Sequence, residues 1–252
     1  MVSFVADVIL HFMASSSPPL ERVRADIRSL LKAQAASDAL AAYYALHAPT
    51  HQVKVVAHYA ENQPNGFLVS ARTGLDLFRP LVTFRAPEAS VAEWLFREGL
   101  TPGRPVYLTV PQALGPWANK FLDVSEVELH RVYRLRADRH QVLMNVLAVT
   151  GYDANGAPRV EIRSRNELGA VAGLNWQSPD FAEIYVYTDP AVRGRGWGKA
   201  VVSILSGLVL KSGRTPLYVV AESNDYSIRL AEAVGFEDTG VREFVANAVL
   251  PA

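Results

Sequence analysis

One short stretch in the last third of the sequence has the residue types and spacing of a loop that binds phosphate. It runs from Arg193 to Lys199 as Arg-Gly-Arg-Gly-Trp-Gly-Lys, and it follows an apolar segment that ends at Thr188 and a turn marked by Asp189-Pro190. Glycines let the backbone approach a ligand without an intervening Cβ, and arginines pair with phosphate oxygens. A helix that starts here would add free N–H groups and its dipole. The stretch therefore predicts a phosphate-binding loop.

Two familiar phosphate-loop patterns do not fit this stretch. A Walker A loop needs Ser or Thr after its Gly-Lys pair, whereas Ala200 follows Gly198 and Lys199. A dinucleotide fingerprint needs a further glycine three positions after Gly196, where this chain has Lys199. The pattern R-x-x-G-x-G remains, and it is filled by Arg193, Gly196 and Gly198.

The loop resembles the acetyl-CoA loop of the GNAT superfamily of N-acetyltransferases, which reads Q/R-x-x-G-x-G/A shortly after a strand. A second motif of that family, N-x-x-A/S-x-x-L-Y-x-x-x-G-F, is matched downstream at Asn224, Ser227, Leu230, Gly235 and Phe236. The two motifs stand in the family's order with a plausible separation. The resemblance covers about residues 165 to 245.

The resemblance implies that acetyl-CoA binds this half as co-substrate and that an amine attacks its thioester directly. The pantetheine arm would lie between strands at Ile184–Thr188 and Leu217–Val220, and the pyrophosphate would lie on the glycine-rich loop. No metal is implied. Trp197 is expected to turn its side chain into the core. The residues implied in cofactor binding are Val186, Tyr187, Thr188, Arg193, Gly194, Arg195, Gly196, Trp197, Gly198, Lys199, Asn224 and Ser227.

The catalytic groups are harder to assign. Ala231 stands where many relatives carry a tyrosine that protonates the leaving thiolate. A general base must also take a proton from the amine. Glu183 is the first candidate, although its register is shifted by one residue from the glutamate of relatives, and Glu222 is the second. Both residues are also consistent with solvated carboxylates at strand ends that take no part in catalysis. Possible replacements for the missing tyrosine are Tyr185, Tyr187 and Tyr226.

Composition excludes several other functions. The 25 Lys and Arg balance the 25 Asp and Glu, and no basic stripe with interleaved aromatic residues is present, so neither nucleic acid nor a membrane is an expected partner. The absence of cysteine removes disulfides, thiol nucleophiles and Cys-based zinc sites. The histidines have no zinc-ligand spacing. Met1 to Met13 lacks the basic start of a secretory signal, so a cytoplasmic protein is expected.

Hydrophobic periodicity predicts alternating strands and helices in the C-terminal half. A helix over Asp225–Val234 has Asn224 as its N-cap and Gly235 as its terminator. The segment Asp238–Glu243 is expected to be a polar turn or strand edge that could border the acceptor pocket. The other predicted elements are a helix over Arg139–Val149, a turn over Gly151–Pro158, strands over Val160–Arg163, Ala170–Trp176 and Phe181–Thr188, a helix over Lys199–Lys211, and strands over Leu217–Val220 and Phe236–Val249.

The N-terminal half follows a similar order of elements but has no R-x-x-G-x-G loop. A helical pattern over Pro18–Leu46, in which a second helix is expected after Ser37-Asp38, is followed by strands and a turn at Asn62–Gly66. The remaining predicted elements are strands over Val53–Tyr59, Phe67–Ala71, Leu75–Phe84, Pro105–Val110 and Val127–Leu135, with helices over Ser90–Glu98 and Gln112–Phe121. The order predicts an α/β chain of layered α+β type. We expect a degenerate GNAT-like domain over residues 1–130, and a GNAT domain with a mixed central sheet over residues 131–252.

The predicted function is transfer of an acetyl or other small acyl group from a CoA thioester to an amine acceptor. Two alternatives remain open. The absence of tyrosine at Ala231 and the uncertain base fit a non-catalytic protein that binds or senses acyl-CoA. A structural or interaction protein that keeps only the fold would need no such loop. The acceptor, the acyl chain length and the oligomeric state do not follow from the sequence.

Overall fold

The computed structural model describes residues 19–74 and 76–252. Its strands form one mixed sheet in the order β1-β2-β3-β4-β11-β5-β10-β9-β8-β7-β6. The strands are β1 (Val53–Ala60), β2 (Gln63–Ala71), β3 (Leu81–Arg85), β4 (Pro105–Pro111), β5 (Asp123–Leu135), β6 (Ala148–Tyr152), β7 (Pro158–Ser164), β8 (Glu167–Gln177), β9 (Phe181–Thr188), β10 (Thr215–Ala221) and β11 (Phe236–Val249).

Both halves of the chain repeat one order of elements around this sheet. Three strands are followed by a helix, a strand, a second helix and a long last strand: β1-β2-β3-α4-β4-α5-β5 in the first half and β7-β8-β9-α6-β10-α7-β11 in the second. The helices are α2 (Leu20–Ile27), α3 (Ala39–Ala42), α4 (Ala89–Gly99), α5 (Gly115–Phe121), α6 (Trp197–Lys211) and α7 (Asp225–Val234).

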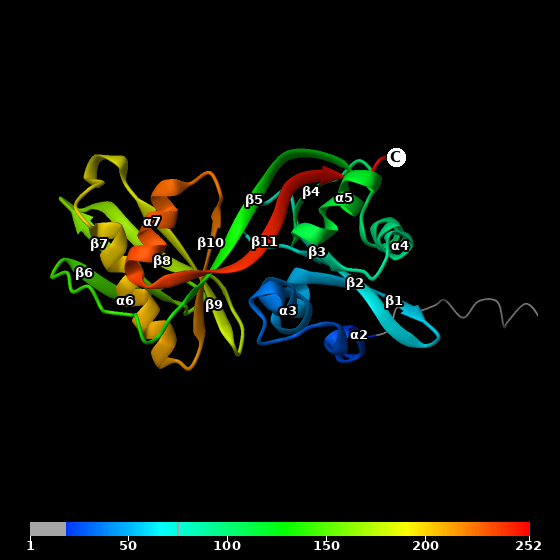
Figure 1. Cartoon of the computed structure of the whole chain (residues 1–252), viewed down its shortest axis with the longest axis horizontal. Helices are drawn as coiled ribbons and strands as arrows, with labels where there is room; N and C mark the ends of the chain where they lie inside the picture. Colours follow the sequence, from blue (N-terminus) through cyan, green and yellow to red (C-terminus); the bar gives the residue numbers. More distant parts are fainter. Residues whose placement is uncertain (1–18, 75) are drawn as a thin grey trace, which may run out of the picture.

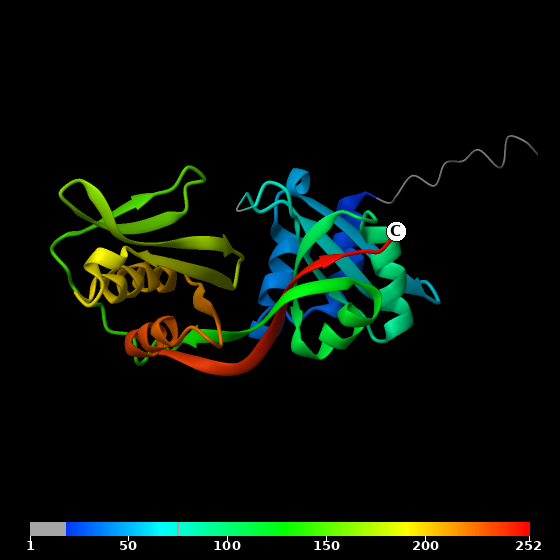
Figure 2. The same cartoon turned by 90° about the horizontal axis from the view of Figure 1, so that it is seen from above.

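The two halves exchange their last strands. The strand β5, which ends the first set, pairs antiparallel with β10 of the second, and β11 pairs antiparallel with β4 of the first. Strands β5 and β11 also pair with each other. Figures 1 and 2 show them as the two long strands that join the ends of the molecule. Residue 130 lies inside β5, which runs through this position without a linker.

The helices divide the core into three parts. Helices α6 and α7 pack on the C-terminal part of the sheet around Val201, Leu205 and Leu230. Helices α4 and α5 cover the N-terminal part around Leu95 and Phe96. A third core lies under α2, α3 and the π-helical turn η3 (Tyr43–His47), and it reaches strands of the C-terminal half, where the ring of Tyr43 stacks on that of Trp176 at 5.3 Å.

The C-terminal elements agree closely with the sequence predictions. Strand β9 and helix α7 have the predicted bounds. The Asn224 side chain caps α7 by accepting a hydrogen bond from the Ser227 N–H at 3.1 Å. Gly235 ends that helix in the left-handed conformation at φ 103°, and Gly213 follows α6 at φ 81°. Left-handed backbone favours glycine, which is why these residues stop their helices.

The helix predicted over Arg139–Val149 is wrong. The chain runs without regular structure from residue 136 to residue 147 and then enters β6. It lies across α6, where the Leu143 N–H donates to Ser203 Oγ at 2.9 Å and that hydroxyl donates to the Gln141 carbonyl at 2.8 Å. Because α6 already covers this face of the sheet, the apolar residues of the segment have no sheet surface on which a helix could pack.

Three N-terminal predictions differ from the structure in their bounds. Within the helical pattern over Pro18–Leu46, short 3-10 turns separate α2 from α3, and α3 starts directly after Asp38, as predicted; Pro18 lies outside the described residues. The predicted turn at Asn62–Gly66 is only Glu61-Asn62, both with positive φ, because β2 already starts at Gln63. The predicted strand over Leu75–Phe84 is confined to β3; Asp76 instead accepts hydrogen bonds from the Phe78 and Arg79 N–H groups, which fold this stretch into a turn. Leu75 is outside the described residues.

Candidate functional site

The glycine-rich loop lies between β9 and α6, as predicted. The Asp189 carboxylate accepts a hydrogen bond from the Ala191 N–H at 2.7 Å and fixes the turn at Pro190. Gly194 and Gly196 follow with φ values of 80° and 75°, in the left-handed region. Gly196 is the N-cap of α6, and none of the described side chains caps this helix. The first N–H groups of α6 therefore have no side-chain partner, which favours binding of an anion.

Steric space differs among the loop glycines. A Cβ on Gly198 would lie 2.7 Å from Thr188 Oγ1 and 3.0 Å from Leu230 Cδ1, so this position needs glycine for close packing of α6 on β9. A Cβ on Gly194 or Gly196 would meet no atom within 4 Å. These two glycines are thus required by backbone conformation, while the space beside them is open to a ligand.

Basic side chains surround this open space. A shallow depression next to the loop is lined by Gly194, Gly196, Gly198, Lys199, Tyr226, Arg229 and Leu230. The Arg193 guanidinium lies 5.9 Å from the centre of the Tyr226 ring, and that of Arg195 lies 5.5 Å from the Trp197 ring. Trp197 itself is buried in the core, as predicted. The depression therefore combines positive charge with free helix N–H groups.

Strands β9 and β10 separate beside this loop. They pair in parallel only from Phe181 to Glu183 on β9, opposite Thr215 to Leu217 on β10. The later residues of β9, including Val186, Tyr187 and Thr188, pair on their other side with β8. The edge of β9 that faces β10 is therefore left without strand pairing from Ile184 onward among the described residues. An extended ligand can lie in such an opening and bond to the backbone.

Tyr218 is a polar group near this opening that the sequence analysis did not select. It lies on β10, and its hydroxyl is 2.6 Å from Ser227 Oγ on α7. Burial raises the pKa of the Tyr218 phenol above its usual range, so the hydroxyl stays protonated. Ala231, which is also on α7, is fully buried in the hydrophobic core. Successive side chains of a strand point to opposite faces. Tyr218 and Val220, two positions apart on β10, therefore point into the same core, and this alternation is the sequence signal that could have identified Tyr218.

Glu183 projects from β9 on the face opposite α6. Its carboxylate accepts hydrogen bonds from Asn175 Nδ2 at 2.6 Å and from Trp176 Nε1 at 2.7 Å. A register shift in β8 between Leu174 and Trp176 brings Asn175 to this position. Burial raises the pKa of the Glu183 carboxyl, although the two hydrogen bonds act in the opposite direction.

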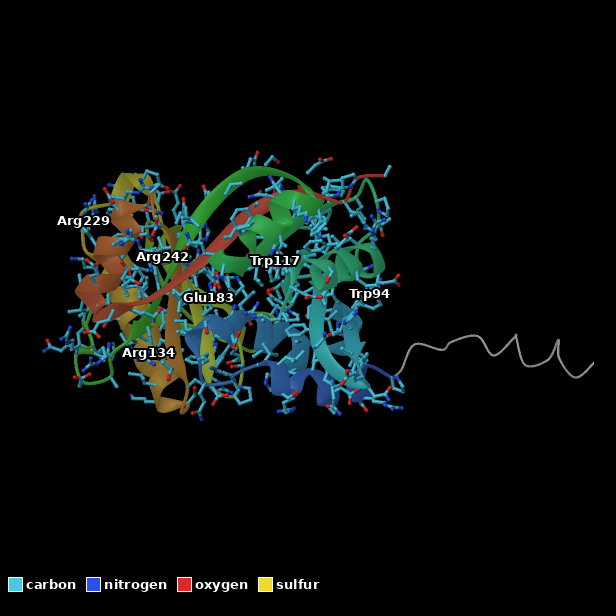
Figure 3. The ribbon with its side chains drawn as sticks, turned by 45° about the vertical axis from the view of Figure 1, so that its right-hand side comes forward. Trp94, Trp117, Arg134, Glu183, Arg229 and Arg242 are labelled. Carbon is cyan, nitrogen blue, oxygen red and sulfur yellow. The ribbon has the colours of Figure 1, made fainter. Side chains whose placement is uncertain are left out.

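Glu183 lines a cavity of about 440 Å³ to which both halves of the chain contribute. Figure 3 shows Glu183 where the C-terminal strands meet the helical segment of the N-terminal half. The N-terminal lining is Leu40, Tyr44, Thr73, Asp76, Arg79, Leu81, Tyr107 and Thr109. The C-terminal lining is Asn175, Trp176, Glu183, Val219, Glu243 and Val245, with His130 from β5.

A second buried carboxyl, that of Glu243 on β11, lines the same cavity. Glu243 is only 8% exposed to solvent. Burial and the nearby charge of Glu183 raise the pKa of Glu243 to about 8, and Arg85 acts in the opposite direction. The segment Asp238–Glu243, predicted as a polar turn or strand edge, instead lies inside β11, and its last residue, Glu243, lines the cavity without having been predicted as a site residue. A lone glutamate in a polar stretch gives no sign that it is buried.

Glu222, the second candidate base, is held elsewhere. Its carboxylate forms ion pairs with Arg131 at 3.1 Å and Arg242 at 2.7 Å, and it is not among the residues that line the cavity. Glu183 therefore lines the cavity, whereas Glu222 lies outside it and is bound to two arginines.

Two further observations concern the part of the chain that the structure describes. It contains no group of three or more His, Cys, Asp or Glu side chains arranged to hold a metal ion. None of its helices has the length and hydropathy needed to span a bilayer.

Comparisons with known proteins give one sequence-level match. A family model described as FR47-like protein matches residues 160–245, which include the glycine-rich loop, Glu183 and α7. No curated protein sequence matches the chain.

Solved structures are similar over most of the chain. A protein of the GNAT family from Novosphingobium aromaticivorans has a TM-score of 0.57 at 18% identity and covers 78% of this chain and 92% of its own. A GCN5-related N-acetyltransferase from Sphaerobacter thermophilus has a TM-score of 0.60 at 12% identity, with 91% and 94% covered. A tandem GNAT protein from the clavulanic acid biosynthesis pathway has a TM-score of 0.54 at 15% identity, with 81% and 85% covered.

Proposed function

We propose that this chain, which has the GNAT fold, is an acyl-CoA-dependent N-acyltransferase that transfers an acetyl group to a primary amine. One observation carries the proposal. The start of α6 is uncapped, has left-handed glycines at Gly194 and Gly196, and adjoins the separated strands β9 and β10. Glu183 lies on the other face of β9 and lines a cavity. In this proposal the loop would bind an anion at the open end of the separated strands, and Glu183 would act at their paired end.

The residues around this opening fit acetyl-CoA. Its pyrophosphate would bind the N–H groups from Arg193 to Lys199, with the Arg193 and Arg195 side chains nearby. The pantetheine arm would lie between β9 and β10 and bond to the backbone at Val186, Tyr187 and Thr188. Asn224 and Ser227 at the start of α7 would lie near its sulfur end. The proposal requires no metal.

The acceptor amine would enter from the cavity. Its nitrogen attacks the thioester carbonyl carbon, so that an N–C bond forms while the C–S bond breaks. The proton on the nitrogen passes to the carboxylate of Glu183, which acts as general base. A raised pKa suits this role because it makes the Glu183 carboxylate a stronger base than the carboxylate of an exposed glutamate.

The leaving thiolate needs a proton or a hydrogen bond. Ala231 cannot supply one, and its side chain is buried. We propose that the Tyr218 hydroxyl takes this role, because it lies 2.6 Å from Ser227 Oγ and is protonated. A thiol of CoA is a good leaving group, so this contribution is expected to be at the low end of the ~10²–10⁴-fold range of acid catalysis.

The N-terminal half, residues 1–130, would be a degenerate GNAT-like unit. Two features support this: it repeats the element order of the second half, and its own β3-to-α4 connection is only Ala86-Pro87-Glu88, without glycine. That connection lacks the left-handed backbone of the second loop. We infer that the first half has lost its cofactor site and now forms one wall of the acceptor cavity.

A second candidate function is that of an acyl-CoA-binding protein without catalysis, which the buried alanine at position 231 favours. It predicts binding of acetyl-CoA and no release of thiol with any amine. A panel of primary amines with detection of free CoA thiol separates the two functions, since only the transferase releases thiol in an acceptor-dependent manner.

The cofactor site is tested first by titration calorimetry with acetyl-CoA. We expect the wild type to bind and Gly196→Asp to lose at least about 10²-fold in affinity, because a like charge beside the pyrophosphate costs several kcal/mol. Gly196→Asn is the matched control. It has the same shape and also tolerates positive φ, and the site has space for its side chain, so it should retain most of the affinity. Equal affinity of wild type and the aspartate variant would refute the assigned loop.

A further inference from the structure

The Glu243 carboxyl lines the cavity, and its oxygens are not among the fully buried atoms that lack a partner, so they are open to the space of the cavity. Among the residues that the structure describes, none forms a hydrogen bond or ion pair with these oxygens, although Glu243 is only 8% exposed. The other buried acid, Glu183, differs in this respect, since Asn175 and Trp176 donate to it. An acid that is largely removed from bulk water and has no protein donor gains from a ligand that supplies one. Such a group points to a ligand that supplies the missing donor.

The basic side chains near the cavity already have acidic partners. Arg79 bonds to Asp76 at 2.7 Å and to Asn247 at 2.6 Å. Arg85, which lies close enough to lower the pKa of Glu243, forms its own ion pair with Asp38 at 3.0 Å. His130 Nε2 lies 2.9 Å from Glu128. The remaining unbalanced groups of the cavity are therefore acidic, and the ligand that suits them is a cation.

The two acids occupy different parts of the cavity. Glu183 lies on β9 and Glu243 on β11, and the strands β10 and β5 run between them. Apolar side chains line the space around them: Leu40, Tyr44, Leu81, Trp176, Val219 and Val245. A ligand that reaches both acids thus needs two polar nitrogens, joined by an apolar stem that packs on these side chains.

We propose that Glu243 binds a second cationic group of the acceptor, so that the preferred acceptor is an aliphatic amine with an ammonium or guanidinium group at its other end. The inference rests on the proposed transferase function for the identity of the reacting amine. Glu183 receives the proton of the reacting nitrogen. The Glu243 carboxyl, which is protonated at neutral pH in the free protein, releases its proton when the cation binds, and it then fixes the far end of the same molecule by a charge-assisted hydrogen bond. Glu243 is a specificity residue in this arrangement and takes no part in the bond changes.

The test compares straight-chain diamines, from diaminopropane to diaminodecane, with monoamines of the same length. We expect the wild type to show a KM about 10- to 100-fold lower for the best diamine than for its monoamine, as a hydrogen bond to a charged group implies. In Glu243→Gln this preference should fall to near unity. Glu237→Gln is the matched control: Glu237 lies on the same strand in surface ion pairs with Arg136 and Arg139, so the preference should remain.

Binding of the diamine is also measured by calorimetry without acetyl-CoA, which separates this inference from the proposed function. Diamine binding that Glu243→Gln weakens supports the site even if no transfer occurs. Equal KM and equal affinity for diamine and monoamine in the wild type overturn the inference, whether or not transfer is observed. A fall in kcat for both amines in Glu243→Gln, with the diamine preference intact, also overturns it and assigns Glu243 to proton transfer instead.

Discussion

Replacing Glu243 by glutamine should stabilise the folded protein, and more so at higher pH. The native state keeps a proton on Glu243 up to its pKa of about 8, whereas the unfolded chain releases it near 4.5. Between these values the unfolded state binds fewer protons than the native state, so the free energy of unfolding falls as pH rises. Glutamine does not titrate, so Glu243→Gln removes this pH-dependent fall in the free energy of unfolding while keeping nearly the same side-chain shape.

The size of the effect follows from the pKa difference. Each pKa unit corresponds to about 1.4 kcal/mol, so the carboxyl destabilises the native state by about 3 kcal/mol at pH 7 and by less than about 1 kcal/mol at pH 5. The gain from Glu243→Gln should therefore be larger at pH 7 by about 2 kcal/mol. For a chain of this length, that difference corresponds to roughly 4–8 °C in Tm.

Thermal and urea unfolding at pH 5 and pH 7 measure this difference directly. Glu237→Gln is again the control, because its carboxylate is in surface ion pairs and its loss should not stabilise the protein at pH 7. A change in Tm that is the same at both pH values, or a destabilised variant at pH 7, would refute the reasoning. It would mean that Glu243 is ionised and well stabilised in the native state.

Two further predictions concern the chemical step. Tyr218→Phe should lower kcat by about 10²-fold and leave acetyl-CoA affinity unchanged, because only the hydroxyl beside Ser227 is lost; an unchanged kcat with the best amine would remove Tyr218 from the mechanism. Glu183→Gln should lower kcat/KM by about 10²- to 10⁴-fold and abolish the rise of kcat/KM with pH. In the wild type this rise should occur above the usual pH range of a glutamate, because the pKa of Glu183 is raised. A pH profile that persists in the variant would show that another group is the base.

The sequence predicted the C-terminal elements well because their signals are local. Asn224 and Gly235 define α7 through a side-chain cap and a left-handed residue, and both need only neighbouring residues to act. The loop from Arg193 to Lys199 has the predicted geometry for the same reason. Its glycines mark the backbone conformation that starts α6.

The failures come from effects that depend on distant parts of the chain. The segment over Arg139–Val149 has helical spacing of apolar residues, but α6 occupies the surface it would need, and Ser203 on that helix bonds to its backbone. Burial of Glu243 is likewise a tertiary property, since it depends on α3 and η3 covering the central strands. Neither position could be assigned from residue type and spacing.

The exchanged strands have a consequence for the order in which the protein folds during synthesis. β4 pairs with β11, which is made after every other described element, so the sheet of the N-terminal half stays incomplete while the C-terminal half is being made. Pairing of such distant segments is slow, and an exposed strand edge attracts other chains until it is covered. The cavity wall that carries Glu243 arrives with that same strand. The binding cavity is therefore among the last features to form, and a ribosome-bound chain without β11 cannot yet have it.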